Sequence, residues 1–313
     1  MDRLQLDKNA KLTGRVYFKD EVMWLGLSGS GASFTFDGTK LVLKLKGDNI
    51  AVGDNPIDYA RIAVYVDGKR VVDEMIDCAE KEVTVIDRTE SAKSVVEIIK
   101  LSESPMSAVG IEAFAEGSAE ALPEKPLKIE FIGDSITCGY GVDDEDENHQ
   151  FTTATEDVTK AYAYKTAKAL DAEYSMFSAS GYGIVSGYTE GDEPISEQTI
   201  PQFYCSYGFS RGNFAGTAPQ DIPWDFSKYI PQIIVINLGT NDDSYCRDHK
   251  DRQAVFSKLY ADFLAVIREK NPQAYILCTV GIMGERIFPA VEEGIKIYLK
   301  SHADSKISSM MFH

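Results

Sequence analysis

The chain has 313 residues, which is enough for two domains because a single hydrophobic core rarely grows much beyond about 250 residues. Its 32 Lys and Arg residues against 49 Asp and Glu residues give a formal net charge of −17, which repels nucleic-acid phosphates and anionic lipids. No run approaches the roughly 20 apolar residues that span a bilayer. We therefore expect neither nucleic acid nor a membrane as a partner.

The start of the chain and its cysteines bear on the compartment and on cofactors. "MDRLQLDKNA" lacks the basic and apolar segments of a secretory signal, which favours a cytoplasmic protein. A secreted protein whose signal is absent from this sequence is the alternative. The cysteines form no Cys-x-x-Cys pair that would suggest zinc or a redox couple, so we expect reduced thiols. They are Cys78, Cys138, Cys205, Cys246 and Cys278.

Residues 1–122 show an apolar period of two, which is typical of half-buried strands. In "KLVLKLK" (40–46) the leucines share one face and the lysines fall on the other. Asp37-Gly38 and Asp67-Gly68 each separate two such runs and predict hairpin turns. Further strands are expected over 82–87, 94–101 and 108–114. Roughly eight short strands predict an antiparallel β-sandwich of jelly-roll type.

The polar stretch "EGSAEALPEKP" (116–126) contains two prolines and predicts a linker. Beyond it, apolar runs alternate with helical segments, which predicts a parallel sheet with helices on both faces over residues 123–313. The apolar runs lie at 129–135, 173–181, 232–242, 274–283 and 306–313.

A long helix is predicted over residues 251–272, between the third and the fourth of these strands. Asn271-Pro272 ends it. Apolar residues at helical spacing are expected to face the sheet. They are Phe256, Leu259, Phe263, Val266 and Ile267.

Small and polar residues follow the first three strands of this second domain. Ser135 follows the first, Gly181 and Gly183 the second, and Gly239, Asn241 and Asp242 the third. Parallel strands end at one edge of the sheet, where such folds bind ligands. The Ser135 N–H, a glycine N–H and the Asn241 amide would supply three donors beside a hydroxyl, as in an oxyanion hole for acyl transfer. Each segment taken singly is also compatible with an ordinary turn.

These segments carry a family resemblance. "IGDSIT", "SASG" and "GTND" resemble, in order and in position, the first three sequence blocks of the SGNH (GDSL-type) hydrolases. "GDSITCGYG", "WDFSKYIPQIIVINLGTND" and the preceding sandwich resemble carbohydrate esterase family 2, in which a jelly roll precedes the hydrolase domain. The resemblance spans nearly the whole chain and implies a three-layer α/β/α hydrolase domain over 123–313 without metal or cofactor.

The resemblance also implies roles for residues. Ser135 would be the nucleophile, and the Ser135 N–H, the Gly181 N–H and the Asn241 side chain would hold the oxyanion. The family removes acetyl groups from plant cell-wall polysaccharides such as xylan and glucomannan. The implied activity is therefore that of a carbohydrate acetylesterase that works through an acyl-enzyme on acetylated carbohydrate. The sequence leaves a homo-oligomer open.

The sequence departs from the family pattern at the catalytic histidine. Its Asp-x-x-His or Trp-His-Pro-like context is absent, and His149, His249 and His302 are expected at the surface. His313 is the remaining candidate for the general base, without which a serine hydroxyl is a weak nucleophile. We expect that the C-terminal end is missing from the sequence and that the base follows His313.

A protein of a different class is the alternative reading, namely a carbohydrate-binding protein whose hydrolase domain is inactive. Several aromatic residues near the expected site could stack on sugar rings or pack inside the protein, and for Trp224 we expect packing. They are Tyr182, Tyr188, Phe203, Tyr204, Tyr207 and Trp224.

Overall fold

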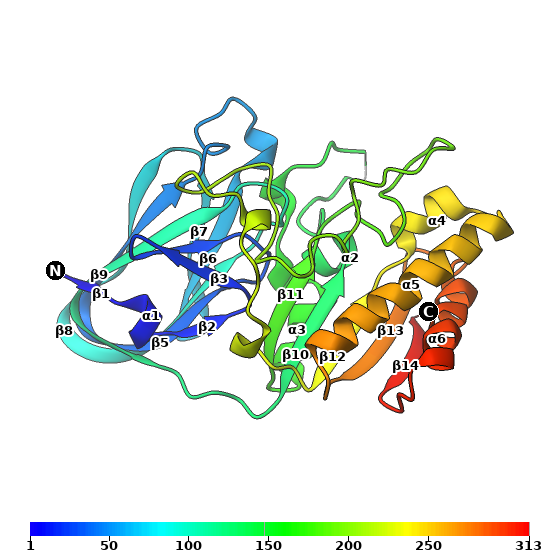
Figure 1. The fold of residues 1–313 in the computed structure, drawn as a ribbon. Helices are drawn as coiled ribbons and strands as arrows, with labels where there is room; N and C mark the ends of the chain where they lie inside the picture. Colours follow the sequence, from blue (N-terminus) through cyan, green and yellow to red (C-terminus); the bar gives the residue numbers. More distant parts are fainter. Residues whose placement is uncertain (147, 313) are drawn as a thin grey trace.

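The structure is a computed structural model that describes residues 1–146 and 148–312. Two sheets lie beside each other (Figure 1). The N-terminal strands, blue to cyan, form one sheet, and the green-to-red part of the chain forms the second sheet with its helices. We call these parts the N-terminal sheet and the C-terminal α/β unit.

Nine strands of the described chain build the N-terminal sheet, in the order β3-β4-β9-β5-β8-β6-β7, with β1 paired to β9 and β2 to β5. All of these pairs are antiparallel, which confirms the expected fold class. The strands are β1 (Asp2–Leu4), β2 (Lys11–Thr13), β3 (Val16–Lys19), β4 (Val22–Leu25), β5 (Gly31–Gly47), β6 (Ala60–Val66), β7 (Lys69–Ile76), β8 (Glu80–Lys100) and β9 (Val109–Ala121). Short helices are α1 (Leu6–Asn9) and the 3₁₀ turn η1 (Pro56–Asp58).

The hairpin predicted at Asp67-Gly68 is confirmed, because it joins β6 to β7 with both residues at positive φ. The hairpin predicted at Asp37-Gly38 is wrong. Both residues lie inside β5, and Gly38 pairs with Ala92 on one side and Gly117 on the other, next to a shift in register. A Cβ on Gly38 would lie 2.3 Å from the Glu116 carbonyl oxygen, so this glycine permits a close approach of strands rather than a turn.

The predicted linker is also shorter than expected. Residues 116–121 belong to β9, where Glu116 pairs with Lys40 and Ala121 with Phe34. Pairing with a distant strand therefore overrides the polar composition of this segment. Residues 122–127 connect β9 to the first strand of the C-terminal α/β unit.

The C-terminal α/β unit contains a five-stranded, fully parallel sheet in the order β11-β10-β12-β13-β14, as predicted. Its strands are β10 (Lys128–Gly133), β11 (Glu173–Ser178), β12 (Ile233–Asn237), β13 (Tyr275–Gly281) and β14 (Ile307–Phe312). The helices are α2 (Ser135–Cys138), α3 (Tyr162–Ala169), α4 (Thr240–Cys246), α5 (Lys250–Lys270) and α6 (Phe288–Ser301). Single 3₁₀ turns are η2 (Thr153–Thr155), η3 (Val158–Lys160), η4 (Pro219–Asp221) and η5 (Phe226–Lys228).

Helices α5 and α6 cover one face of this sheet (Figure 1). The stripe predicted on α5 is partly wrong, because Leu259 is 39% exposed whereas Tyr260 and Leu264 are buried beside Phe256 and Ile267. The buried residues Tyr260, Leu264 and Ile267 lie four, eight and eleven residues after Phe256. These spacings fit the 3.6 residues of a helical turn better than the predicted residues do.

The other face of the parallel sheet packs against both α3 and the N-terminal sheet. Ile129 and Phe131 of β10 share one core with Ala163 of α3, with Ile99 of β8 and with Leu101, which directly follows β8. The N-terminal sheet thus takes the place of helices over part of this face.

None of the described helices combines the length and the apolar character that crossing a bilayer requires. The five cysteines are free thiols in the structure, as expected, and Cys138, Cys246 and Cys278 are buried.

Candidate active site

Ser135 lies at the carboxyl edge of the parallel sheet, as the sequence predicted. Strand β10 ends at Gly133, and Asp134 caps α2 by accepting a hydrogen bond from the Ile136 N–H at 3.1 Å. A Cβ on Gly133 would lie 2.0 Å from Thr137 Oγ1, so only glycine allows the tight turn between strand and helix. The half-buried Ser135 is therefore the first residue of α2.

The register of the sheet brings the three predicted strand ends together. Gly133 pairs with Ser178 of β11 and with Asn237 of β12. The residues that follow these three positions therefore leave the sheet at the same level, and Ser180, Gly181 and Asn241 line a common pocket with Ser135.

The loop after β11 is held by Asp242 of α4. Its buried carboxylate accepts hydrogen bonds from the N–H groups of Ile184, Val185 and Ser186, at 2.6 to 3.1 Å. Burial raises the pKa of Asp242 to about 6, while these N–H groups oppose the rise. A Cβ on Gly183 would lie 2.5 Å from Asp242 Oδ2, so Gly183 is required for the carboxylate to enter the loop.

Asn241 joins all three strand ends through its side-chain amide. Asn241 Nδ2 donates to the Tyr182 carbonyl oxygen at 2.8 Å and makes a longer contact of 3.4 Å with Asp134 Oδ2. Asp134 is fully buried, and this burial raises the pKa of its carboxyl group to about 7.

In the described chain, neither the backbone N–H nor the hydroxyl of Ser135 makes a hydrogen bond, and nor does the Gly181 N–H. These groups are therefore available to a molecule in the pocket. Gly181 has φ of +80°, a conformation that side chains disfavour, and it thus marks a backbone position suited to glycine.

The pocket has a volume of about 550 Å³ and mostly apolar walls. The residues lining it are Ser135, Ile136, Gly139, Tyr140, Val142, Lys160, Ala161, Tyr162, Ser180, Gly181, Tyr188, Asn241, Ile282 and Met283. Tyr140 and Tyr188 are exposed on its rim, and the Tyr140 ring stacks on Phe151 with 4.5 Å between centroids.

Of the six aromatic residues expected near the site, Tyr188 lines the pocket. Tyr204 and Tyr207 are buried in the cores, and Trp224 packs against Arg15, in line with the expectation of packing. The sequence analysis missed Tyr140, although its place within "CGYG" directly after the Ser135 turn is a usable signal.

The histidines at 149, 249 and 302 are exposed, as predicted, and none of them lines the Ser135 pocket. His149 contacts Asp144 at 2.9 Å, and His302 stacks on Tyr298. His313, the remaining candidate for the base, lies outside the described residues.

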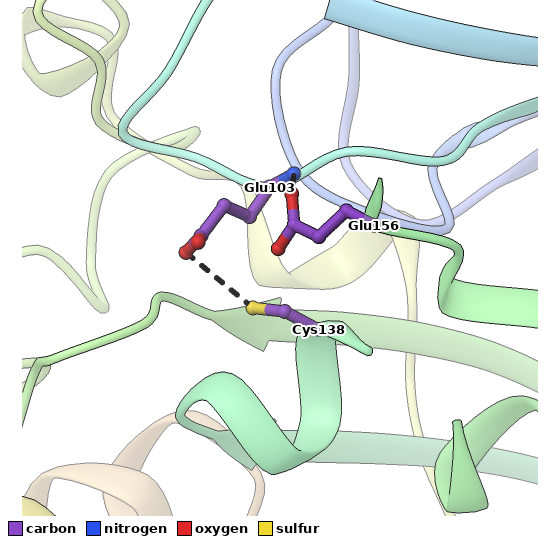
Figure 2. A group of neighbouring side chains, drawn as sticks. All are labelled: Glu103, Cys138 and Glu156. Carbon is purple, nitrogen blue, oxygen red and sulfur yellow. Dashed lines mark hydrogen bonds between the residues drawn. The ribbon is translucent and has the colours of Figure 1, made fainter. Parts of the chain in front are cut away.

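Figure 2 shows a buried polar cluster that the sequence analysis did not anticipate, and Ser180 connects this cluster to the pocket. Glu103, Cys138 and Glu156 are all fully buried. One carboxylate oxygen of each glutamate and the Cys138 Sγ lie within 4.8 Å of one another. Glu103 comes from the loop between β8 and β9, whereas Cys138 ends α2. Nothing in the local sequence around Glu103 signals this contact, because it arises between the two parts of the fold.

Comparisons with known proteins agree with this architecture. The model of the GDSL-like lipase/acylhydrolase family matches residues 131–298, and the model of the carbohydrate esterase 2 N-terminal domain matches residues 12–126. The chain therefore joins the N-terminal region of a carbohydrate esterase to a GDSL-type catalytic fold. It belongs to the GDSL-like lipase/acylhydrolase family, which confirms the resemblance seen in the sequence.

Individual relatives are similar to this chain over most of its length. The chain is similar to the cellulase/esterase CelE of Acetivibrio thermocellus, with 32% identity over 259 residues, 82% of this chain and 29% of that protein. It is 29% identical over 282 residues to an acetylxylan esterase/glucomannan deacetylase of Cellvibrio japonicus, covering 88% of this chain and 72% of that protein. The chain thus spans less than a third of the first relative.

A solved family two carbohydrate esterase from Clostridium thermocellum, in complex with cellohexaose, superimposes with a TM-score of 0.79 at 27% identity. The match covers 97% of this chain and 88% of that chain.

The contact between Gly183 and Asp242 gives a testable prediction. Gly183→Ala should force the Asp242 carboxylate or the loop to move, lowering the free energy of unfolding by about 1–3 kcal/mol and weakening the ester hydrolysis that is proposed below. Chemical denaturation and a p-nitrophenyl acetate assay measure both effects. Gly191→Ala, in the same loop but with its nearest atom at 3.4 Å, is the control and should change neither. Equal behaviour of the two variants would contradict the role given to Gly183.

The raised pKa of Asp134 predicts how stability depends on pH. Between its ordinary pKa near 4 and about 7, the folded state keeps a proton that the unfolded chain has released. The unfolding free energy of the wild-type protein should therefore fall relative to Asp134→Asn as pH rises through this window, by up to about 1.4 kcal/mol per pH unit. Above pH 7 the difference should be level.

Urea unfolding at several pH values measures this difference. Asp225→Asn is the control, because Asp225 also caps a short helix by accepting from the Ser227 N–H at 3.0 Å but its pKa is lowered at an exposed site. Its difference from the wild type should be level from pH 4 to 7. A level difference for Asp134→Asn would show that its carboxyl group ionises normally.

Proposed function

We propose that the chain is a serine esterase that removes O-acetyl groups from plant cell-wall polysaccharide or oligosaccharide, such as xylan or glucomannan. Family membership and relatives named as esterases or deacetylases support a carbohydrate esterase. In this proposal residues 123–313 carry the catalysis and residues 1–122 form the preceding domain.

The observation that carries the proposal is the meeting of Ser135 with three N–H donors in one pocket. Two of them, the Ser135 N–H and the Gly181 N–H, make no hydrogen bond in the described chain. The Ser135 N–H, the Gly181 N–H and the Asn241 amide belong to three successive strand ends. The Asn241 hydrogen that points to Asp134 over 3.4 Å is weakly engaged, so it is available to a developing oxyanion. Donors placed where negative charge develops stabilise the transition state of acyl transfer.

The chemistry then runs in two steps. The Ser135 oxygen attacks the acetyl carbonyl carbon and its proton passes to a base, giving a tetrahedral oxyanion held by the three donors. The C–O bond to the sugar breaks, the sugar oxygen takes the proton, and water hydrolyses the acetyl-serine to acetate by the same route. Strand β14 ends at Phe312, whose ring lies 6.3 Å from that of Tyr162 in the pocket, and the candidate His313 follows it in the sequence.

The rim of the pocket fits a carbohydrate. Exposed tyrosine rings such as Tyr140 and Tyr188 present flat apolar faces with a polar tip, which suits the faces of sugar rings. The Tyr140 ring is itself stacked on the Phe151 ring. The negative charge of the chain is compatible with an uncharged substrate.

The test is the Ser135→Ala variant. Acetate release from acetylated xylan and from p-nitrophenyl acetate should fall to background, while the melting temperature stays near that of the wild-type protein, because Ser135 is half-buried and its hydroxyl makes no hydrogen bond in the described chain. Ser301→Ala, at the exposed end of α6, is the control. If Ser135→Ala kept a tenth of the activity, the assignment of Ser135 as the nucleophile would be wrong. Oligosaccharide binding without Ser135-dependent hydrolysis would favour the alternative of a binding protein.

Asn241 gives a second kinetic prediction. Removing one oxyanion donor typically costs about 10²–10³ in kcat, so Asn241→Ala should lose activity in kcat with little change in KM. Steady-state kinetics on an acetylated oligosaccharide measure the two constants, with the exposed Asn213→Ala as the control. A large rise in KM at unchanged kcat would instead make Asn241 a residue that binds the substrate.

A further inference from the structure

The loop between β8 and β9 is buried along its whole length, which is unusual for a connection that carries polar residues. It covers residues 101–108 and inserts between the N-terminal sheet and the C-terminal α/β unit. The Leu101 carbonyl accepts from the Val158 N–H at 3.3 Å, and the Pro105 carbonyl accepts from the Arg211 N–H at 2.8 Å. The loop is thus fixed by the second part of the fold.

Glu103 is the residue of this loop that reaches the Ser135 pocket from behind. Its Oε2 accepts a hydrogen bond from the Ser180 N–H and lies 3.6 Å from Cys138 Sγ, a contact drawn as a dashed line in Figure 2. Cys138 Sγ also lies 3.3 Å from Ser178 Oγ. Ser180 directly precedes Gly181, and Cys138 ends the helix that Ser135 begins. One carboxylate therefore contacts the backbone N–H next to Gly181 and the side chain that ends the helix begun by Ser135.

Glu156 completes this arrangement. Its Oε2 accepts from the Glu103 backbone N–H at 2.9 Å, and the Oε1 atoms of both glutamates are buried with no other partner in the described chain. Two carboxylates packed together away from water cannot both be ionised, so one proton belongs to the pair. Because Glu103 already accepts from Ser180 and Cys138, the favoured arrangement places the proton on Glu156, with its O–H directed at Glu103.

The surrounding charges fit one remaining negative charge on the pair. Lys100 is fully buried next to it and donates from Nζ to the carbonyl oxygens of Ser102 at 2.8 Å and Glu103 at 3.1 Å. The other ionisable groups that face the pair are Cys138, Asp134 and Tyr140, while Asp48 faces Lys100. Burial raises the pKa of both glutamates, and that of Glu156 is raised well above its ordinary value. Lys100 is therefore the compensating cation.

We propose that Glu103 is a positioning residue for the oxyanion hole, in which its carboxylate, hydrogen-bonded by a protonated Glu156, orients the Ser180–Gly181 backbone toward Ser135. This proposal rests on the esterase function proposed above. Its consequence is that the N-terminal sheet contributes to catalysis, since it supplies a residue without which the Gly181 N–H is not held in place.

The test compares three variants of the full chain. Glu103→Ala leaves the Ser180 N–H without an acceptor, and a small displacement of a catalytic group can cost up to about 10²-fold, so kcat should fall about 10- to 100-fold with KM nearly unchanged. Glu103→Gln keeps an amide oxygen for Ser180 and donates to an ionised Glu156, so it should restore most of kcat. Glu156→Gln, which mimics the protonated acid, should also remain active.

A control separates positioning from general destabilisation. Glu130→Ala removes another buried glutamate at the contact between the two parts of the fold, and Glu130 bonds Tyr204 and Arg15 rather than the pocket. It should lower the melting temperature without lowering kcat in assays well below that temperature. A boronic acid that forms a tetrahedral adduct with Ser135 gives a second readout, because its affinity should weaken in Glu103→Ala in proportion to kcat/KM and stay unchanged in Glu130→Ala.

Three results would overturn the proposal. The first is a kcat of Glu103→Ala within twofold of the wild-type value, and the second is an equal loss of kcat in Glu130→Ala. The third is one equivalent of a metal ion in the purified protein that is lost in Glu103→Gln, since a cation would then replace the shared proton. If Ser135→Ala kept its activity, the esterase function itself would fail, which is a separate outcome.

Discussion

A parallel sheet must be covered on both faces, and in this protein the second face is covered in part by the N-terminal sheet. Helix α3 has eight residues and shares its core with Ile99 of β8 and with Leu101, which directly follows β8. Burial of apolar surface therefore holds the two parts together. The loops of the N-terminal sheet are pressed against the edge where β10, β11 and β12 end, and this contact determines which residues lie behind Ser135.

Polar groups buried by that contact must find partners within it, because an unpaired polar group away from water costs free energy. Arg15, with no exposed surface, donates to the carbonyl oxygens of Tyr204 and Ser206 at 2.6 and 2.5 Å and lies 3.3 Å from Glu130. Its guanidinium also lies over the Phe177 ring, 4.3 Å from the centroid. The same demand produces the Glu103 cluster, where a carboxylate from one part of the fold accepts a hydrogen bond from the Ser180 backbone N–H of the other. The polar contacts that join the two parts of the fold therefore include the contact of Glu103 behind the active site.

Much of the candidate site could be predicted because a simple rule connects sequence to space. Ser135, Gly181 and Asn241 each follow an apolar run, and parallel strands of equal length end at one edge. The rule does not predict Glu103 or Tyr140. Glu103 belongs to a loop of the other sheet, and Tyr140 belongs to the turn after α2. It also failed at Asp37-Gly38. The hairpin signal there is local, whereas β5 continues through it because β8 and β9 pair with it on both sides. The exposure of Leu259 has a similar cause, since the position of α6 decides which face of α5 is covered.

The sequence by itself determined the two fold types, the five parallel strands and the residues at their ends, because apolar periodicity and glycine turns are local properties that each segment carries with it. The tertiary structure alone decided how the two parts pack, which aromatic side chains are buried and which glutamates share a proton. These features depend on contacts between residues far apart in the chain, such as Glu103 with Ser180 and Arg15 with Glu130. No local pattern encodes such contacts, because the free energy that selects them is gained only when the separate surfaces meet and exclude water.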